Sequence, residues 1–216
     1  EVWNEPDMAK FWSGTQAEYF MLYDRTVAGA KRANPAIRIG GPSPSGPHQI
    51  SENKQLGKRF IDHIFANTSD QRADLSRLDF FSIHTWNFLD ANINGYFQTV
   101  DFLTSRGLDL PILVTEAGPT WQFNLDPQPH DTVHGAAFIV ETVASLIQRA
   151  NDQRQRLPSL WVWWVLSDLF EEGTYREGDP FIGCMGLLTR EGLEKPAYHA
   201  FQLLHRMGSS LLEMTV

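Results

Sequence analysis

Residues 111–116 read PILVTE, an apolar run that ends on a threonine and a glutamate. Such a run after a proline predicts a buried strand, and Glu116 then stands where the strand ends. A nearly continuous apolar strand is typical of a parallel sheet that helices cover. The carboxylate at its end suggests that one edge of this sheet carries chemistry.

The same pattern recurs along the chain. Four further strands are predicted, at residues 1–5, 37–41, 78–84 and 160–166. Helices are predicted between them: one that begins at a capping box of Thr15 and Glu18 and stops at Pro35, and others around residues 56–65, 93–103, 135–150 and 196–207. Strands that alternate with helices indicate an α/β fold with a parallel sheet.

The residues at the ends of the strands distinguish between two folds of this class, the (β/α)8 barrel and the doubly wound sheet. Each strand closes on a reactive or hydrogen-bonding group: Glu5, Gly41, His84, Glu116 and Ser167-Asp168. In a (β/α)8 barrel all such ends converge on one site, whereas a doubly wound sheet would use few of them and needs a glycine-rich phosphate loop that is missing here. We therefore expect a partial (β/α)8 TIM barrel, strands 4 to 8 with their helices and the first three βα units missing. Residues 1–216 would be a single catalytic-domain fragment.

Composition excludes some functions. The net charge of −8 disfavours a nucleic-acid or anionic-membrane partner. Cys184 is the only cysteine, which rules out an intrachain disulfide and a thiolate metal site. No apolar run reaches the ~18 residues of a membrane span. Oligomeric state and compartment stay open.

Glu5 and Glu116 are the two carboxylates directly at strand ends. A pair of carboxylates across a cleft is the minimum for cleaving a glycosidic bond. We expect burial and the negative partner to raise the pKa of the proton donor, and Asn4 to donate a hydrogen bond to a sugar hydroxyl. The competing interpretation is a pair of salt bridges at the barrel rim.

Three stretches resemble glycoside hydrolase family 39, the β-xylosidases and α-L-iduronidases. They are EVWNEPD at residues 1–7, FFSIHTW at 80–86 and the long segment WWVLSDLFEEGTYREGDPFIGCMG that begins at Trp163. The resemblance implies that Glu5 is the general acid/base, that Glu116 is the nucleophile and that Glu171 or Glu172 binds a sugar hydroxyl. It also implies double displacement with no cofactor and no metal.

Smaller signals carry two interpretations each. His84 is either a sugar ligand or a buried, hydrogen-bonded rim histidine, and Trp164 is either the floor under the sugar ring or barrel filling. Trp161 and Trp163 should face alternately, with at least one of them pointing outward to the helices. Asp168 should hold a loop by accepting backbone N–H bonds, and His130-Asp131 should fix a loop instead of binding a metal.

The sequence thus predicts a retaining, β-xylosidase-like glycoside hydrolase with a carbohydrate substrate. Ala117-Gly118, Ile182 and Trp86 depart from the xylosidase pattern at the rim, so the sugar stays open. The alternatives are an α-L-iduronidase type, another β-glycosidase or glycanase, and a non-catalytic glycan-binding barrel.

Overall fold

The computed structural model describes residues 1–47, 55–68, 78–86, 89–122, 129–169 and 179–208. Within these ranges the strands are β1 (Gly40–Pro42), β2 (Phe80–Trp86), β3 (Ile112–Gly118) and β4 (Leu160–Trp163). They form one sheet in the order β1-β2-β3-β4, and every pair is parallel. This confirms the predicted α/β class with a parallel sheet.

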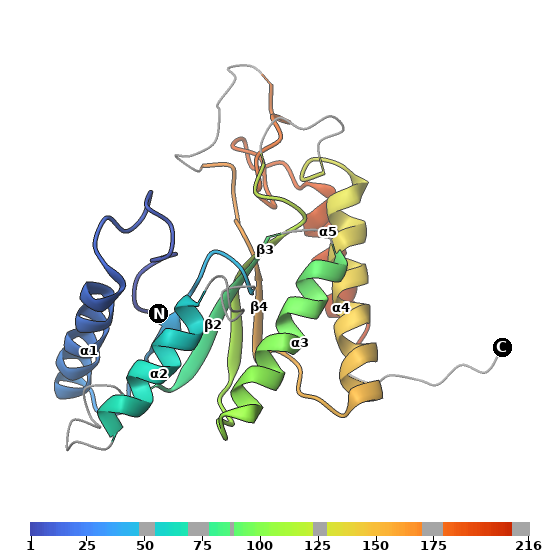
Figure 1. Cartoon of the computed structure of the whole chain (residues 1–216). Helices are drawn as coiled ribbons and strands as arrows, with labels where there is room; N and C mark the ends of the chain where they lie inside the picture. Colours follow the sequence, from blue (N-terminus) through green and yellow to red (C-terminus); the bar gives the residue numbers. More distant parts are fainter. Residues whose placement is uncertain (48–54, 69–77, 87–88, 123–128, 170–178, 209–216) are drawn as a thin grey trace.

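Five helices accompany the sheet in the described ranges. They are α1 (Gln16–Ala33), α2 (Leu56–Thr68), α3 (Leu89–Ser105), α4 (Val133–Gln153) and α5 (Pro196–Arg206). In the view of Figure 1, α1 and α2 lie to the left of the sheet, and α3, α4 and α5 lie to its right. None of the helices described is long and apolar enough to cross a membrane.

Local signals explain the start of α1 well. The Thr15 hydroxyl accepts the Glu18 N–H at 3.2 Å, and the Glu18 carboxylate accepts the Thr15 N–H at 2.7 Å. Both halves of the predicted capping box are therefore present. Tyr19, Tyr23 and Val27 on the inner face of α1 are fully buried in the main core, which fixes this helix against β1 and α2.

The predicted strand at residues 1–5 is wrong, because no strand forms there. The backbone of Trp3 and Glu5 has φ values of 70° and 41°, in the left-handed region that an extended chain cannot contain. Two isolated backbone bonds, both of 3.1 Å, hold this segment beside β1: the Val2 N–H donates to the Gly40 carbonyl in β1, and the Glu5 N–H donates to the carbonyl of Ser43, the residue after β1.

The four other predicted strands are present with different bounds: those predicted at 78–84 and 111–116 are β2 (Phe80–Trp86) and β3 (Ile112–Gly118), and the other two differ more. The strand predicted at 37–41 is found at Gly40–Pro42, and the one predicted at 160–166 ends at Trp163. Beyond Trp163 the backbone changes partner, because the Val165 N–H donates to the Met185 carbonyl and the Leu187 N–H donates to the Val165 carbonyl. The segment after β4 therefore pairs with a later loop instead of extending the sheet.

Candidate active site

A β-bulge in β3 determines where Glu116 points. Ile83 pairs with Val114 and His84 pairs with Glu116, so Thr115 is the extra residue in the ladder. Val114 and Ala117 are buried in the core under the helices. Strict alternation would send Glu116 to that same face, but the bulge turns it to the opposite face. It thereby comes to lie beside His84.

Glu5, His84 and Glu116 meet at the carboxyl ends of β2 and β3. His84 Nδ1 lies 2.8 Å from Glu5 Oε1 and 3.4 Å from Glu116 Oε2. One carboxylate oxygen of each glutamate and the imidazole nitrogen all lie within 4.8 Å of one another. His84 is fully buried, and the two glutamates are 8% and 9% exposed. The two glutamates predicted from the sequence are therefore brought together.

Ser43 completes the network and had no signal in the sequence analysis. Its hydroxyl lies 2.7 Å from His84 Nε2, so both imidazole nitrogens have protein partners. Ser43 and Glu5 both have left-handed backbone conformations, with φ values of 51° and 41°. Such conformations cost of order 1–3 kcal/mol each in residues other than glycine and persist where the surroundings impose them. Here they place the two side chains that hold His84.

The three side chains influence one another's protonation. Burial opposes a charged His84, but the hydrogen bond to Glu5 and the negative charges of both glutamates outweigh burial and raise its pKa. Burial also raises the pKa of Glu116 from 4.5 to about 7, against the opposing charge of His84 and a hydrogen bond from Trp86. The sequence analysis expected burial and a negative partner to raise the pKa of a site carboxylate, and both causes act on Glu116.

The same cluster has the spacing of a cation site. However, His84 Nδ1, the atom that would face an ion, already contacts both carboxylates. As the side chains stand, Nδ1 of the imidazole bridges the two glutamates.

Trp86 lies over the strand that carries Glu116. It pairs with Gly118 across the ladder, and a Cβ added at Gly118 would come within 2.6 Å of the Trp86 ring. Gly118 is therefore needed for the indole to reach its present place. These two departures from the xylosidase pattern are coupled in space, although they are distant in the sequence.

The remaining predicted residues lie around this cluster. Asn4 is half-buried in the turn before Glu5, and Trp164 is half-buried directly after β4. The backbone N–H of Trp164 donates to the Ala117 carbonyl at 3.0 Å, and this bond ties the Trp164 backbone to the residue after Glu116. Glu171 and Glu172 lie outside the described residues.

Trp161 and Trp163 both pack toward the helices, against Phe201 and Phe138 respectively. The expectation that the two face alternately is therefore wrong, because residues two positions apart in a strand lie on the same face. The expectation that at least one points outward to the helices is met. Trp164 follows β4 directly, so the period of this strand does not extend to it.

The loop-fixing residues behave as predicted. His130 Nε2 lies 3.0 Å from the Thr120 carbonyl. Asp131 accepts the Gly183 N–H, and Asp168 accepts the Gly186 N–H at 2.7 Å. The sequence analysis did not foresee that both carboxylates also contact Lys195.

The raised pKa of Glu116 predicts a pH dependence of stability. A pKa raised from 4.5 to about 7 means that the folded protein holds this proton more tightly than the unfolded chain does. The resulting stability is fully present below pH ~4.5 and is lost as the pH rises through ~7. Glu116→Gln has no such proton to lose. We therefore expect the wild-type free energy of unfolding to fall relative to that of Glu116→Gln as the pH rises from 5 to 8.

Urea unfolding of both proteins at several pH values measures this difference. Glu141→Gln, on an exposed position of α4, is the control for removing one charge. If the difference in free energy of unfolding between Glu116→Gln and wild type does not change with pH, the argument from burial is contradicted.

Comparisons with known proteins first define a fold and then a family. A glucosidase structure from Croceicoccus marinus superimposes with a TM-score of 0.68 at 18% identity, over 94% of this chain and 39% of that one. At this level of identity the likeness concerns the fold, which is that of the TIM-barrel glycosidases, of which this chain covers only part. The profile of glycosyl hydrolases family 39 matches residues 1–216, and the chain belongs to that family.

Two curated relatives illustrate the range of the family. The chain is 32% identical to a β-xylosidase of Caldicellulosiruptor saccharolyticus, over 99% of this chain and 42% of that protein. It is 29% identical to an α-L-iduronidase of Canis lupus familiaris, over 74% of this chain and 26% of that protein. The chain thus spans less than half the length of each.

Proposed function

We propose that the full-length protein is a retaining glycoside hydrolase of the β-xylosidase type. The observation that carries the proposal is the buried pair of Glu5 and Glu116, with carboxylate oxygens within 4.8 Å of each other. Retaining enzymes hold their two carboxyl groups about 5–5.5 Å apart, whereas inverting enzymes need a wider gap for a water molecule. Membership of family 39 and the likeness to a β-xylosidase support the same reaction.

In the proposed mechanism, Glu116 attacks the anomeric carbon while Glu5 gives its proton to the leaving oxygen. The glycosidic bond breaks, and a covalent bond forms between the sugar and Glu116. Glu5, now ionised, then takes a proton from water as the water attacks the same carbon, which releases the sugar and restores both carboxyl groups. Neither step requires a cofactor.

The surrounding residues support these steps. His84 contacts both carboxylates and has no ring nitrogen left for a sugar hydroxyl, so we assign it the positioning of Glu5 and Glu116. Asn4 would donate to the hydroxyl beside the anomeric carbon, and Trp164 would form the floor of the sugar site. The assignment of Glu171 or Glu172 to a sugar hydroxyl rests on the resemblance alone.

The chain itself would be the single catalytic-domain part that contributes strands 4 to 8 of an eight-stranded barrel. Under this numbering β1, β2, β3 and β4 are the fifth to eighth strands, and the turn that carries Glu5 follows the place of the fourth. This explains why Val2 and Glu5 hydrogen-bond alongside β1 even though no strand forms there.

Hydrolysis of p-nitrophenyl β-xyloside by the full-length protein, followed by proton NMR, tests the proposal. A retaining enzyme releases β-xylose first, and the α anomer grows only with mutarotation. Release of α-xylose first would overturn the retaining mechanism. Turnover of an aryl α-L-iduronide or β-glucoside in place of the xyloside would keep the mechanism and change the sugar, and no turnover of any glycoside would favour a glycan-binding barrel.

A further inference from the structure

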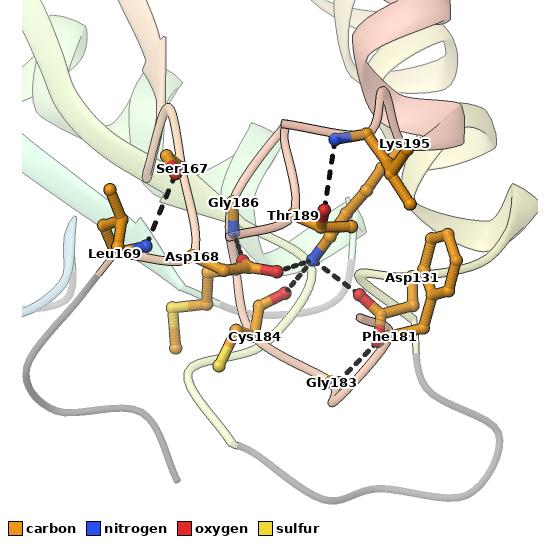
Figure 2. Close-up of polar contacts among 12 residues, drawn as sticks. Asp131, Ser167, Asp168, Leu169, Phe181, Gly183, Cys184, Gly186, Thr189 and Lys195 are labelled. Carbon is orange, nitrogen blue, oxygen red and sulfur yellow. Dashed lines mark hydrogen bonds and ion pairs between the residues drawn. The ribbon is translucent and has the colours of Figure 1, made fainter. Parts of the chain in front are cut away.

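Lys195 holds a buried ammonium group at the start of α5. Its side chain is fully buried, and Nζ lies 2.6 Å from Asp131 Oδ1, 2.6 Å from Asp168 Oδ2 and 2.9 Å from the Cys184 carbonyl oxygen. Figure 2 shows the ammonium pointing into the space between these oxygens. A buried charge is tolerated only where partners such as these replace water.

The partners of Lys195 come from three separate segments. Asp131 precedes α4, Asp168 follows β4, and Cys184 lies in the loop that leads toward α5. The same two carboxylates also accept the N–H groups of Gly183 and Gly186 (Figure 2). A Cβ at Gly186 would lie 2.5 Å from Asp168 Oδ1, so the contact requires glycine. The loop at 183–186 is thus fixed at both ends to the Lys195 cluster.

This loop is connected in turn to the candidate active site. The Met185 carbonyl accepts the Trp163 indole N–H at 2.7 Å and the Val165 N–H at 3.3 Å. The two donors come from the residues before and after Trp164. The backbone N–H of Trp164 itself donates to the carbonyl of Ala117, the residue next to Glu116. Hydrogen bonds and the peptide links between them therefore connect Lys195 to the backbone of Trp164, the proposed floor of the sugar site.

We propose that Lys195 is a positioning residue: its ammonium acts as a tethered cation that joins three segments and thereby holds Trp164 beside Glu116. The assignment rests on the proposed function, because it gives Trp164 its role under the sugar. Lys195 touches neither Glu5 nor Glu116, so its loss should act through the geometry of sugar binding more than through the chemical step.

Lys195→Ala in the full-length protein tests this role. The variant leaves two carboxylates and a carbonyl around a space of the size of an alkylammonium head group. We expect KM for p-nitrophenyl β-xyloside to rise about tenfold and kcat to change less than about threefold, as for loss of ground-state binding. Hydrogen exchange of the amides at 183–188 should become faster.

Chemical rescue separates a tethered cation from simple packing. Methylammonium can occupy the place of Nζ, so it should restore both KM and slow exchange, whereas tetramethylammonium has no N–H to donate and should not. Lys31→Ala is the matched control: Lys31 also pairs with an aspartate, Asp79, at 2.7 Å, but near the start of β2, at the opposite end of the sheet. It should leave KM unchanged.

Each outcome decides the proposal. A KM and exchange rates like those of Lys31→Ala would overturn it, and so would a rise in KM that methylammonium does not reverse. If Lys195→Ala does not fold even with methylammonium, Asp131→Asn is the second variant, because it removes one of the two carboxylates that contact the ammonium. Unchanged KM and unchanged exchange rates in Asp131→Asn would overturn the proposal. If wild type hydrolyses no glycoside, the proposed function fails, while exchange at 183–188 still decides whether Lys195 holds the loop.

Discussion

Glu116→Ala in the full-length protein should lower kcat for p-nitrophenyl β-xyloside by about 10³-fold or more, because the sugar then has no nucleophile. Azide should restore turnover, since this small anion fits the space that the carboxylate leaves. Attack by azide is a single displacement, so the product should be the α-xylosyl azide, with inverted configuration at the anomeric carbon. Product configuration by NMR is the measurement.

The configuration of this product decides whether Glu116 is the nucleophile or the proton donor. Its raised pKa alone would suggest the proton donor. Burial raises the pKa of Glu116 to about 7, and a raised pKa is typical of a proton donor. The family resemblance makes Glu116 the nucleophile. Glu116 lies 3.4 Å from His84 and close to Glu5, so a bound sugar that changes these surroundings also changes the pKa of Glu116. A β-configured azide from Glu116→Ala would exchange the two roles.

A control is needed because Glu116 is buried beside His84. Glu141→Ala, at an exposed position of α4, removes one carboxylate without touching the site and should retain wild-type turnover. Circular dichroism of both variants shows whether the fold is kept. Loss of activity without azide rescue in a folded Glu116→Ala protein would argue against its role as nucleophile.

The parts of the fold that depend on neighbours in the sequence could be predicted well. The capping box at Thr15 and Glu18 is present because both partners lie within one turn of helix. The rule that polar groups gather at the carboxyl ends of parallel strands placed His84 and Glu116 at neighbouring strand ends, where the structure has them. The strand predicted at residues 1–5 failed because its left-handed backbone is imposed by contacts with β1 and the residues after it.

The parts of the site that depend on distant residues left no local signal. A bulge of one residue turns Glu116 toward His84, and nothing in PILVTE marks it. Ser43 reaches His84 from a different strand end, 41 positions away in the sequence. Lys195 reads as a lysine before a helix-starting proline, and only the fold reveals that Asp131 and Asp168 enclose it.

Glu5→Ala should give a different kinetic signature from Glu116→Ala. Without a proton donor, substrates with poor leaving groups should lose about 10²–10⁴-fold in kcat/KM, whereas 2,4-dinitrophenyl β-xyloside, which needs no protonation, should keep most of its first step. The second step also needs Glu5 as a base, so the glycosyl-enzyme should accumulate and give a burst of dinitrophenol.

Azide should accelerate the breakdown of that intermediate, because it attacks without needing a base. Two displacements then occur at the same carbon, so the product should be the β-xylosyl azide, the opposite configuration to that from Glu116→Ala. The pH profile should lose its basic limb as well, since that limb reports the proton on the acid. Equal losses for good and poor leaving groups would remove Glu5 from the acid/base role, and the position of His84 between the two glutamates would then need a different explanation.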